Sequence, residues 1–351
     1  MAKWDGIKSP KILDAMRVAL SDDRHFSHTE VVDLVRAALD DGVLTPDKLN
    51  DLGIIARNSD TMPVRSIVML WYLVEQTRKV VGANGLFSLT TNQERSAAEA
   101  ICFFLKRMGN GFFPHLNRDR VGIDLLLRVG NPEIMNQDKA GLCGPFAFVY
   151  GLASDSPQTY VRFAAELYEK GVSRIGDLWI KPSDGCRNCS LPDSMSPADW
   201  LAVASLRDST NVWFDVDHDV DSFWNNQAAS ATVGDIEKWF EQSGYTDVKS
   251  EDNLVEGLDP SDIDDLNRYY SEGRRVILAI NDAMLYAARQ SETTYKGNHI
   301  VGLISLIART PQGVRLTVFS WGRKVAIPQG GPLSEKDFLG NLYGYVAGKA
   351  F

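Results

Sequence analysis

One stretch constrains this chain more than any other: in residues 137–153, a polar run ends at Cys143 and a nearly unbroken apolar run follows to Leu152. This pattern predicts a loop that delivers Cys143 to the first turn of a buried helix, where Pro145 is tolerated. The positive end of a helix dipole favours the thiolate, which is the nucleophilic form of cysteine. Gln137 lies six residues upstream, and its amide with the N–H of Cys143 would supply two donors for an oxyanion. We therefore interpret Cys143 as a catalytic nucleophile.

The apolar periodicity changes from helical to extended along the chain. Residues 1–120 carry helical patterns, including the capping-box sequence Ser27-His-Thr-Glu30, and the glycine-rich segment after Met108 predicts a boundary. The second domain, 121–351, begins with helices and continues with strands over 275–281, 298–307, 313–322 and 324–328, the last three joined as an antiparallel meander; residues 333–346 predict a closing helix. Helices followed by an antiparallel sheet indicate an α+β fold.

Composition excludes several classes of protein. The chain has 351 residues, 44% apolar and 24% charged, which is typical of a globular protein. Its net charge of −9 argues against nucleic-acid binding, which needs clustered Lys and Arg. It has no apolar run of about 18 residues, so we expect no membrane span. The first residues lack the apolar segment of a Sec-type signal peptide, so we expect a cytoplasmic protein as synthesised, with export by another route left open.

A cysteine nucleophile needs a base, and the chain has five histidines. His299 stands at the head of an apolar strand, where a loop can turn its ring toward a cleft. The alternative is a histidine at a strand end that is satisfied by backbone carbonyls.

Three short motifs in this order resemble those of the papain-like cysteine peptidases. They are Gln137 six residues before Cys143-Gly, Asn298-His-Ile-Val-Gly302, and Ser320-Trp-Gly322, and they cover roughly 131–325. The apolar helix after Cys-Gly-Pro also resembles that of papain-fold toxins and effectors of Gram-negative bacteria. The resemblance implies a papain-like fold, with Cys143 on a helical lobe and His299 on a sheet lobe, preceded by an all-α N-terminal domain. It also implies that His299 is the base and that Trp321 shields the pair from water.

The third catalytic residue departs from the papain pattern. Phe319 stands where those peptidases have the asparagine that orients the histidine. Ser320 on the neighbouring strand could take this role, and Asn281 and Asn298 are weaker candidates. Because an orienting residue mainly fixes the tautomer and the ring position, a weak one lowers the rate without abolishing the pair.

The remaining cysteines predict no cofactor or metal. Cys102 lies in an apolar helix and is expected in the core. Cys186 and Cys189 form a single Cys-x-x-Cys with no second ligand pair, whereas a structural zinc site needs four ligands. We expect an exposed loop that carries two thiols, with a metal or redox role as the alternative.

Three hypotheses on function follow. The first is a papain-like hydrolase, most readily a peptidase, in which Cys143 attacks, His299 transfers the proton, Gln137 supports the oxyanion and Ser320 orients His299. The second keeps the acyl-thioester chemistry but modifies Gln side chains, by deamidation or transglutamination. The third is a papain-like fold that binds without turnover.

The expected partners follow from the same hypotheses. The substrate would be a protein, and nucleic acid and membrane are not expected. If the chain is an exported effector or toxin, the helical region 1–120 could contact a chaperone or secretion adaptor, or act as an inhibitory pro-region, and an immunity protein is a further candidate partner. A simple packing role of these helices is the alternative.

Overall fold

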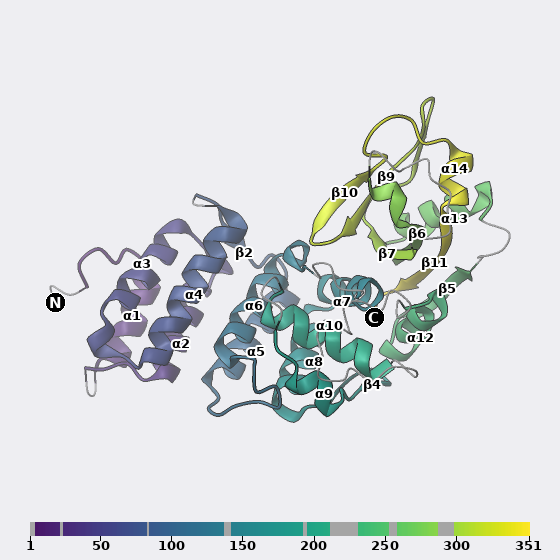
Figure 1. Cartoon of the computed structure of the whole chain (residues 1–351). Coiled ribbons are helices and arrows are strands. Elements are labelled where there is room, and N and C mark those ends of the chain that lie inside the picture. Colours follow the sequence, from purple (N-terminus) through teal and green to yellow (C-terminus); the bar gives the residue numbers. More distant parts are fainter. Residues whose placement is uncertain are drawn as a thin grey trace. The chain divides into compact units, whose positions relative to one another are not determined.

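A computed structural model describes residues 4–21, 24–82, 84–136, 142–191, 195–210, 231–252, 258–286 and 298–351. The chain is α+β and forms two compact units, Met1–Ile134 and Met135–Phe351 (Figure 1). Gln137 lies outside the described residues. Within the described ranges, no helix has the length and apolarity needed to cross a bilayer.

The first unit consists mainly of helices, drawn in purple and blue in Figure 1. Two of them start with a complete capping box, at Ser27 and at Thr91, so the predicted start at Ser27 is confirmed. The helices are α1 (Pro10–Ala19), α2 (His28–Ala38), α3 (Pro46–Arg57), α4 (Val64–Val81), α5 (Asn92–Lys106) and α6 (Arg118–Gly130), with the 3-10 turns η2 (Ser59–Thr61) and η3 (Pro132–Ile134).

Two features of this unit differ from the expectation of an all-α domain over 1–120. β1 (Val43–Leu44) pairs antiparallel with β2 (Phe87–Ser88), so the unit is not purely helical. The compact unit also extends to Ile134, because α6 packs against α4 and α5. Gly122 of α6 permits this approach, since a Cβ there would lie 2.5 Å from Cδ2 of Leu105.

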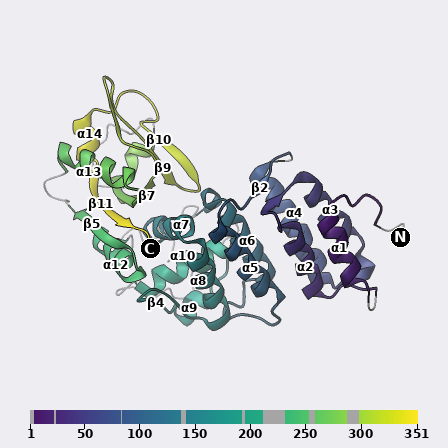
Figure 2. The same cartoon turned by 180° about the vertical axis from the view of Figure 1, so that it is seen from behind.

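The second unit places helices against an antiparallel sheet, and α7, α8 and α10 contact one another in both cartoon views (Figures 1 and 2). Its helices are α7 (Cys143–Asp155), α8 (Pro157–Lys170), α9 (Asp184–Asn188), α10 (Pro197–Thr210), α12 (Val233–Ser243), α13 (Pro260–Ser271) and α14 (Glu335–Gly340), with the 3-10 turn η5 (Asp282–Leu285). A small hairpin joins β3 (Ser173–Ile175) to β4 (Leu178–Ile180).

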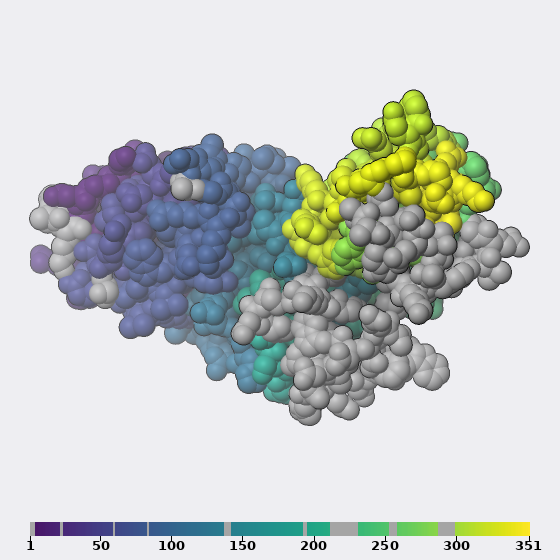
Figure 3. Space-filling view, turned by 45° about the horizontal axis from the view of Figure 1, so that its top comes forward, coloured from purple at the N-terminus to yellow at the C-terminus, as the bar shows by residue number. Residues whose placement is uncertain are grey.

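The main sheet is curled and antiparallel, with the strand order β10-β9-β7-β6-β11-β5 and with β8 paired to β9. The sequence predicted β6, β7, β9 and β10, and the antiparallel pairing predicted for the last three is confirmed; β6 also pairs antiparallel with β7. The strands are β5 (Thr246–Asp252), β6 (Arg275–Asn281), β7 (Asn298–Leu303), β8 (Ala308–Thr310), β9 (Gly313–Ser320), β10 (Arg323–Ile327) and β11 (Leu342–Lys349). The last part of the chain, drawn yellow-green to yellow, gathers in one continuous part of the surface in Figure 3.

The predicted closing helix over 333–346 is wrong. Only α14 is helical there, and β11 follows it between β6 and β5. Seven of the eight residues of β11 are buried, so the strand lacks the alternation of a half-exposed strand and its apolar run can be mistaken for a helix. Gly344 allows β5 to approach, because a Cβ there would lie 2.4 Å from the carbonyl oxygen of Glu251.

The two faces of the sheet bury different partners. On one face, Val301 and Val318 join a buried cluster that includes Ile263 of α13 and Phe338 of α14. On the other, Phe319 stacks on Tyr150 of α7 with ring centroids 3.9 Å apart, and Phe146 of the same helix lies 5.8 Å from it. Helix α7 is therefore fixed against β7 and β9 close to its first turns.

Candidate active site

Cys143 is the first residue of α7, as the sequence predicted, and its side chain is 5% exposed. The preceding residue, Leu142, offers no side-chain acceptor to the helix start, so the first N–H groups stay available for another acceptor. The backbone N–H groups of Ile300, Gly144 and Cys143 lie close enough to the sulfur to favour negative charge on it. Gly144 must be a glycine, because a Cβ there would lie 2.5 Å from Cβ of Ala231.

The expectation that the helix start makes Cys143 a resting thiolate is not met. Burial raises the pKa of the Cys143 thiol, and the three backbone N–H groups and the positive charge of Arg207 offset this only in part. In the structure as it stands, Cys143 is therefore a protonated thiol surrounded by donors that would stabilise negative charge once it forms.

His299 lies on β7, one residue before the amide that reaches Cys143, and its side chain is buried. Its Nε2 atom is 2.7 Å from Oγ of Ser320 on β9. The ring stacks on Trp321 with centroids 4.6 Å apart and an interplanar angle of 27°. Burial lowers the pKa of His299 to about 4, so the imidazole is neutral near pH 7 and has a free lone pair that can accept a proton.

The turn that carries Trp321 is conformationally unusual. Trp321 and Gly322 connect β9 to β10 as a two-residue turn, and both have positive φ, 49° and 70°, as a type I′ hairpin requires. A positive φ is rare for a bulky residue such as Trp and costs on the order of 1–2 kcal/mol. Such strain is concentrated at functional sites, and here it accompanies an indole that covers His299.

The same turn lies beside the segment that leads to Cys143. A Cβ on Gly322 would lie 2.9 Å from the carbonyl oxygen of Met135 and 3.1 Å from Cβ of Asn136. Asn136 is also fixed by its N–H, which donates to Asp199 at 3.0 Å. Asn136 is the residue directly before Gln137, so the predicted oxyanion donor follows a segment that packs against the Trp321 turn.

Phe319 and Ser320 project from opposite faces of β9, because side chains alternate along a strand. Phe319 therefore packs on Tyr150 of α7, whereas Ser320 bonds His299. Asn281 bonds Asn341 and the start of η5, so it serves the local backbone. The side chain of Asn298 lies outside the described residues.

Sequence reasoning missed two groups at this site. The first is the N–H of Ile300, which no side-chain pattern reveals. The second is Arg207 in the last turn of α10, whose charge acts on Cys143. Helix α10 is buried over most of its length, and an arginine in an otherwise apolar and small-residue helix is the signal that could have drawn attention to it.

The Cys-x-x-Cys segment differs from the predicted exposed loop. Residues 184–188 form the short helix α9, which Ser183 caps, and both Cys186 and Cys189 are buried and form no disulfide with a described residue. Burial raises the pKa of Cys186 well above its usual range, and the carboxylate of Asp208 raises it further. In the described part of the chain, no three His, Cys, Asp or Glu side chains gather as a metal site would require.

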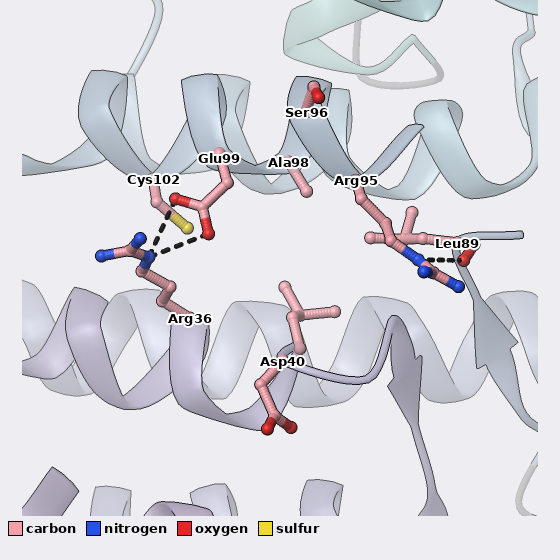
Figure 4. A pocket seen from close by; sticks show the side chains of 9 residues that line it. Arg36, Asp40, Leu89, Arg95, Ser96, Ala98, Glu99 and Cys102 are labelled. Carbon is pink, nitrogen blue, oxygen red and sulfur yellow. Dashed lines mark hydrogen bonds and ion pairs between the residues drawn. The ribbon is translucent and has the colours of Figure 1, made fainter. Parts of the chain in front are cut away.

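The first unit has a separate pocket of about 180 Å³ between α2 and α5 (Figure 4). Arg36 crosses it to pair with Glu99 at 2.8 Å, and Arg95 bonds the carbonyl oxygen of Leu89. Cys102 lies on its wall, and burial raises the pKa of this thiol to about 12. Asp40, which also lines the pocket, pairs with Lys11 at 3.2 Å.

Comparison of the chain with protein-family models, with curated proteins and with solved structures gave no match. The function is therefore argued from the site alone.

Proposed function

We propose that this chain is a cysteine hydrolase with a papain-like arrangement, most readily a peptidase that acts on a protein substrate. One observation carries the proposal: the backbone N–H of Ile300, the residue directly after His299, lies close enough to Cys143 at the start of α7 to favour negative charge on its sulfur. Strand β7 thus carries a candidate base near a nucleophile that is more than 150 residues away in sequence, although no hydrogen bond joins the His299 ring to Cys143 among the described residues. The order of a cysteine on a helix and a histidine on an antiparallel strand supports a papain-like fold.

The reaction would begin from a neutral pair rather than from a preformed ion pair. The sulfur of Cys143 forms a bond to the substrate carbonyl carbon while its proton passes to the imidazole of His299. The carbonyl oxygen becomes an oxyanion, which the N–H of Cys143 and the amide of Gln137 would stabilise. Collapse breaks the C–N bond, and His299 returns the proton to the leaving amine. Water, with His299 as base, then hydrolyses the thioester and regenerates the thiol.

Ser320 and Trp321 would hold the base in place. A serine hydroxyl can donate or accept, so Ser320 fixes the ring of His299 without imposing one tautomer, as an asparagine oxygen would. The stacked indole of Trp321 keeps water from the ring, and this exclusion strengthens electrostatic interactions at the site.

The test compares a reduced, unfolded protein such as casein, incubated with the native chain and with the Cys143→Ala variant. New N-termini that appear with the native chain alone, identified by mass spectrometry, support a peptidase. An intact substrate in which Gln has become Glu would instead support a deamidase, which uses the same thioester. Equal products from the native chain and the variant would contradict both.

A further inference from the structure

Arg207 is a buried cation beside the nucleophile. It lies in the last turn of α10, a helix that packs against α7 and α8, and its side chain is 7% exposed. Its positive charge acts on the sulfur of Cys143 and on the carboxylate of Asp235. Burying a charge without a partner is costly, so its position needs an explanation.

The guanidinium of Arg207 has no partner among the residues that the structure describes. No hydrogen bond or ion pair links it to any residue that the structure describes. Asp235 is engaged elsewhere, since its Oδ2 atom accepts from the N–H and the hydroxyl of Thr232, both at 2.9 Å, in the capping box of α12. Arg207 itself is buried, so its donors lie inside the fold rather than in bulk water.

An unpaired guanidinium is suited to one kind of ligand. It presents five donors in a planar fork that matches a carboxylate with two parallel hydrogen bonds. A neutral substrate would leave these donors unsatisfied when it displaced water from the site. A purely structural arginine would show a carboxylate or carbonyl partner within the fold, as Arg275 does with Asp155 at 2.6 Å.

We propose that Arg207 binds a carboxylate of the substrate next to the bond that Cys143 attacks. This inference rests on the proposed function, and it narrows the substrates to chains with an acidic side chain or a free C-terminus at that position. Arg207 is then a specificity-determining residue.

The test uses two alkylating reagents that differ in charge, iodoacetate and iodoacetamide, with labelling of Cys143 followed by peptide mass spectrometry. Both reagents react with the same sulfur, so a change in the thiol pKa alters both rates equally, whereas an anion site accelerates iodoacetate alone. The ratio of the two rates should be about tenfold higher in the native protein than in urea-unfolded protein, since charge-assisted hydrogen bonds contribute about 1.5–3 kcal/mol.

Arg207→Met should abolish this excess, and Arg207→Lys should keep part of it. The matched control is Arg174→Met, at an exposed arginine of the same unit, which should leave the ratio unchanged. If Arg207→Met does not fold, the proposal is tested by the rate ratio of Arg207→Lys and by the ability of peptides to protect Cys143 of the native protein from alkylation. A native ratio equal to that of the unfolded protein, or one that Arg207→Met leaves unchanged, overturns the proposal.

Peptides identify the source of the carboxylate. Protection of Cys143 by acetyl-Ala-Glu-Ala-amide points to an acidic side chain, and protection by acetyl-Ala-Ala-Ala with a free carboxylate points to a C-terminus. Acetyl-Ala-Gln-Ala-amide is the neutral control, and equal protection by all three peptides contradicts carboxylate recognition.

The outcome also separates this inference from the proposed function. His299→Ala should slow both reagents and leave their ratio high. If the iodoacetate-to-iodoacetamide ratio is high but neither labelling rate depends on His299, the anion site stands and the hydrolase proposal fails. If both labelling rates depend on His299 but the ratio equals that of the unfolded protein, the hydrolase proposal stands and the anion site fails.

Discussion

Cys102 and Cys143 are equally buried, each 5% exposed, yet their surroundings differ. Cys102 lies within α5, and its pKa is raised to about 12 by burial and by the charge of Glu99, against the opposing charges of Arg36 and Lys106. Cys143 opens α7, and three nearby backbone N–H groups, one of them from β7, favour negative charge on its sulfur. Burial raises the pKa of both thiols, so burial alone does not distinguish a core cysteine from a candidate nucleophile.

The two regions differ in how well they would stabilise a negative charge on the cysteine sulfur. Around Cys102 the nearby charges come from side chains that pair with one another, such as Arg36 with Glu99. Around Cys143 the groups that favour negative charge are backbone N–H groups and the cation of Arg207, which has no ion pair among the described residues. Such preorganised donors stabilise a charge that appears during reaction without reorganising.

The largest expected difference is between alanine substitutions of the two cysteines. Cys143→Ala should lower the release of p-nitrophenolate from p-nitrophenyl acetate at least about 10³-fold, because the loss of a nucleophile removes the covalent route. Cys102→Ala should keep the rate and lower the unfolding free energy by about 1 kcal/mol through the small cavity it leaves. Similar losses of p-nitrophenolate release in Cys143→Ala and Cys102→Ala would contradict a catalytic role that is specific to Cys143.

The next comparison is between two buried histidines, one in each unit. His299→Ala should lower the same rate about 10²–10⁴-fold, the usual contribution of a general base. His28 is bonded to Ser66 at 3.0 Å and to the carbonyl oxygen of Leu105 at 3.1 Å, so His28→Ala should reduce stability and leave the activity per folded molecule intact. A rate that falls for His28→Ala but not for His299→Ala would reverse the assignment.

The low pKa of His299 predicts a pH dependence of stability. The unfolded chain binds a proton at His299 near pH 6.5 and the folded protein near pH 4. Between these values the unfolded state holds more protons, so the contribution to stability is complete above pH 6.5 and is lost as the pH falls toward 4. The loss is about 3 kcal/mol. Urea unfolding between pH 4 and pH 6.5 should show that the unfolding free energy of the native protein falls more steeply with falling pH than that of His299→Asn. Equal pH dependence in the two proteins would mean that the pKa of His299 is the same in the folded and unfolded states.

Several site residues could be predicted from the sequence because their signals are local. A polar run that becomes apolar at Cys143 marks a helix start, and an apolar strand headed by His299 marks a strand end. Ser320 could be proposed because it stands one residue from the position of the expected orienting residue.

Other features depend on tertiary packing and leave no local pattern. The strand β11 is buried on both faces, so its periodicity resembles that of a helix. Cys186 and Cys189 are covered by parts of the fold that a short polar segment does not reveal. Ile300 acts on Cys143 through its backbone N–H, and a backbone group leaves no signal in the residue type.

The smallest expected effect concerns the residue that orients the base. Ser320→Ala removes the 2.7 Å hydrogen bond to His299 and should lower the rate about fivefold, since a net hydrogen bond contributes about 1 kcal/mol. Adding Phe319→Asn should not restore the rate, because Phe319 faces α7. Recovery of the rate in the double variant would show that the two side chains can exchange faces.

The central claim is that His299 takes the proton of Cys143, and the rate of iodoacetamide labelling against pH tests it most directly. The measurement compares the native protein with His299→Ala and follows Cys102 in the same sample. We predict that Cys143 reacts at neutral and mildly acidic pH in the native protein, that its rate falls only as His299 protonates near pH 4, and that the variant needs alkaline pH, as Cys102 does. An alkaline profile for Cys143 in both proteins would contradict the account.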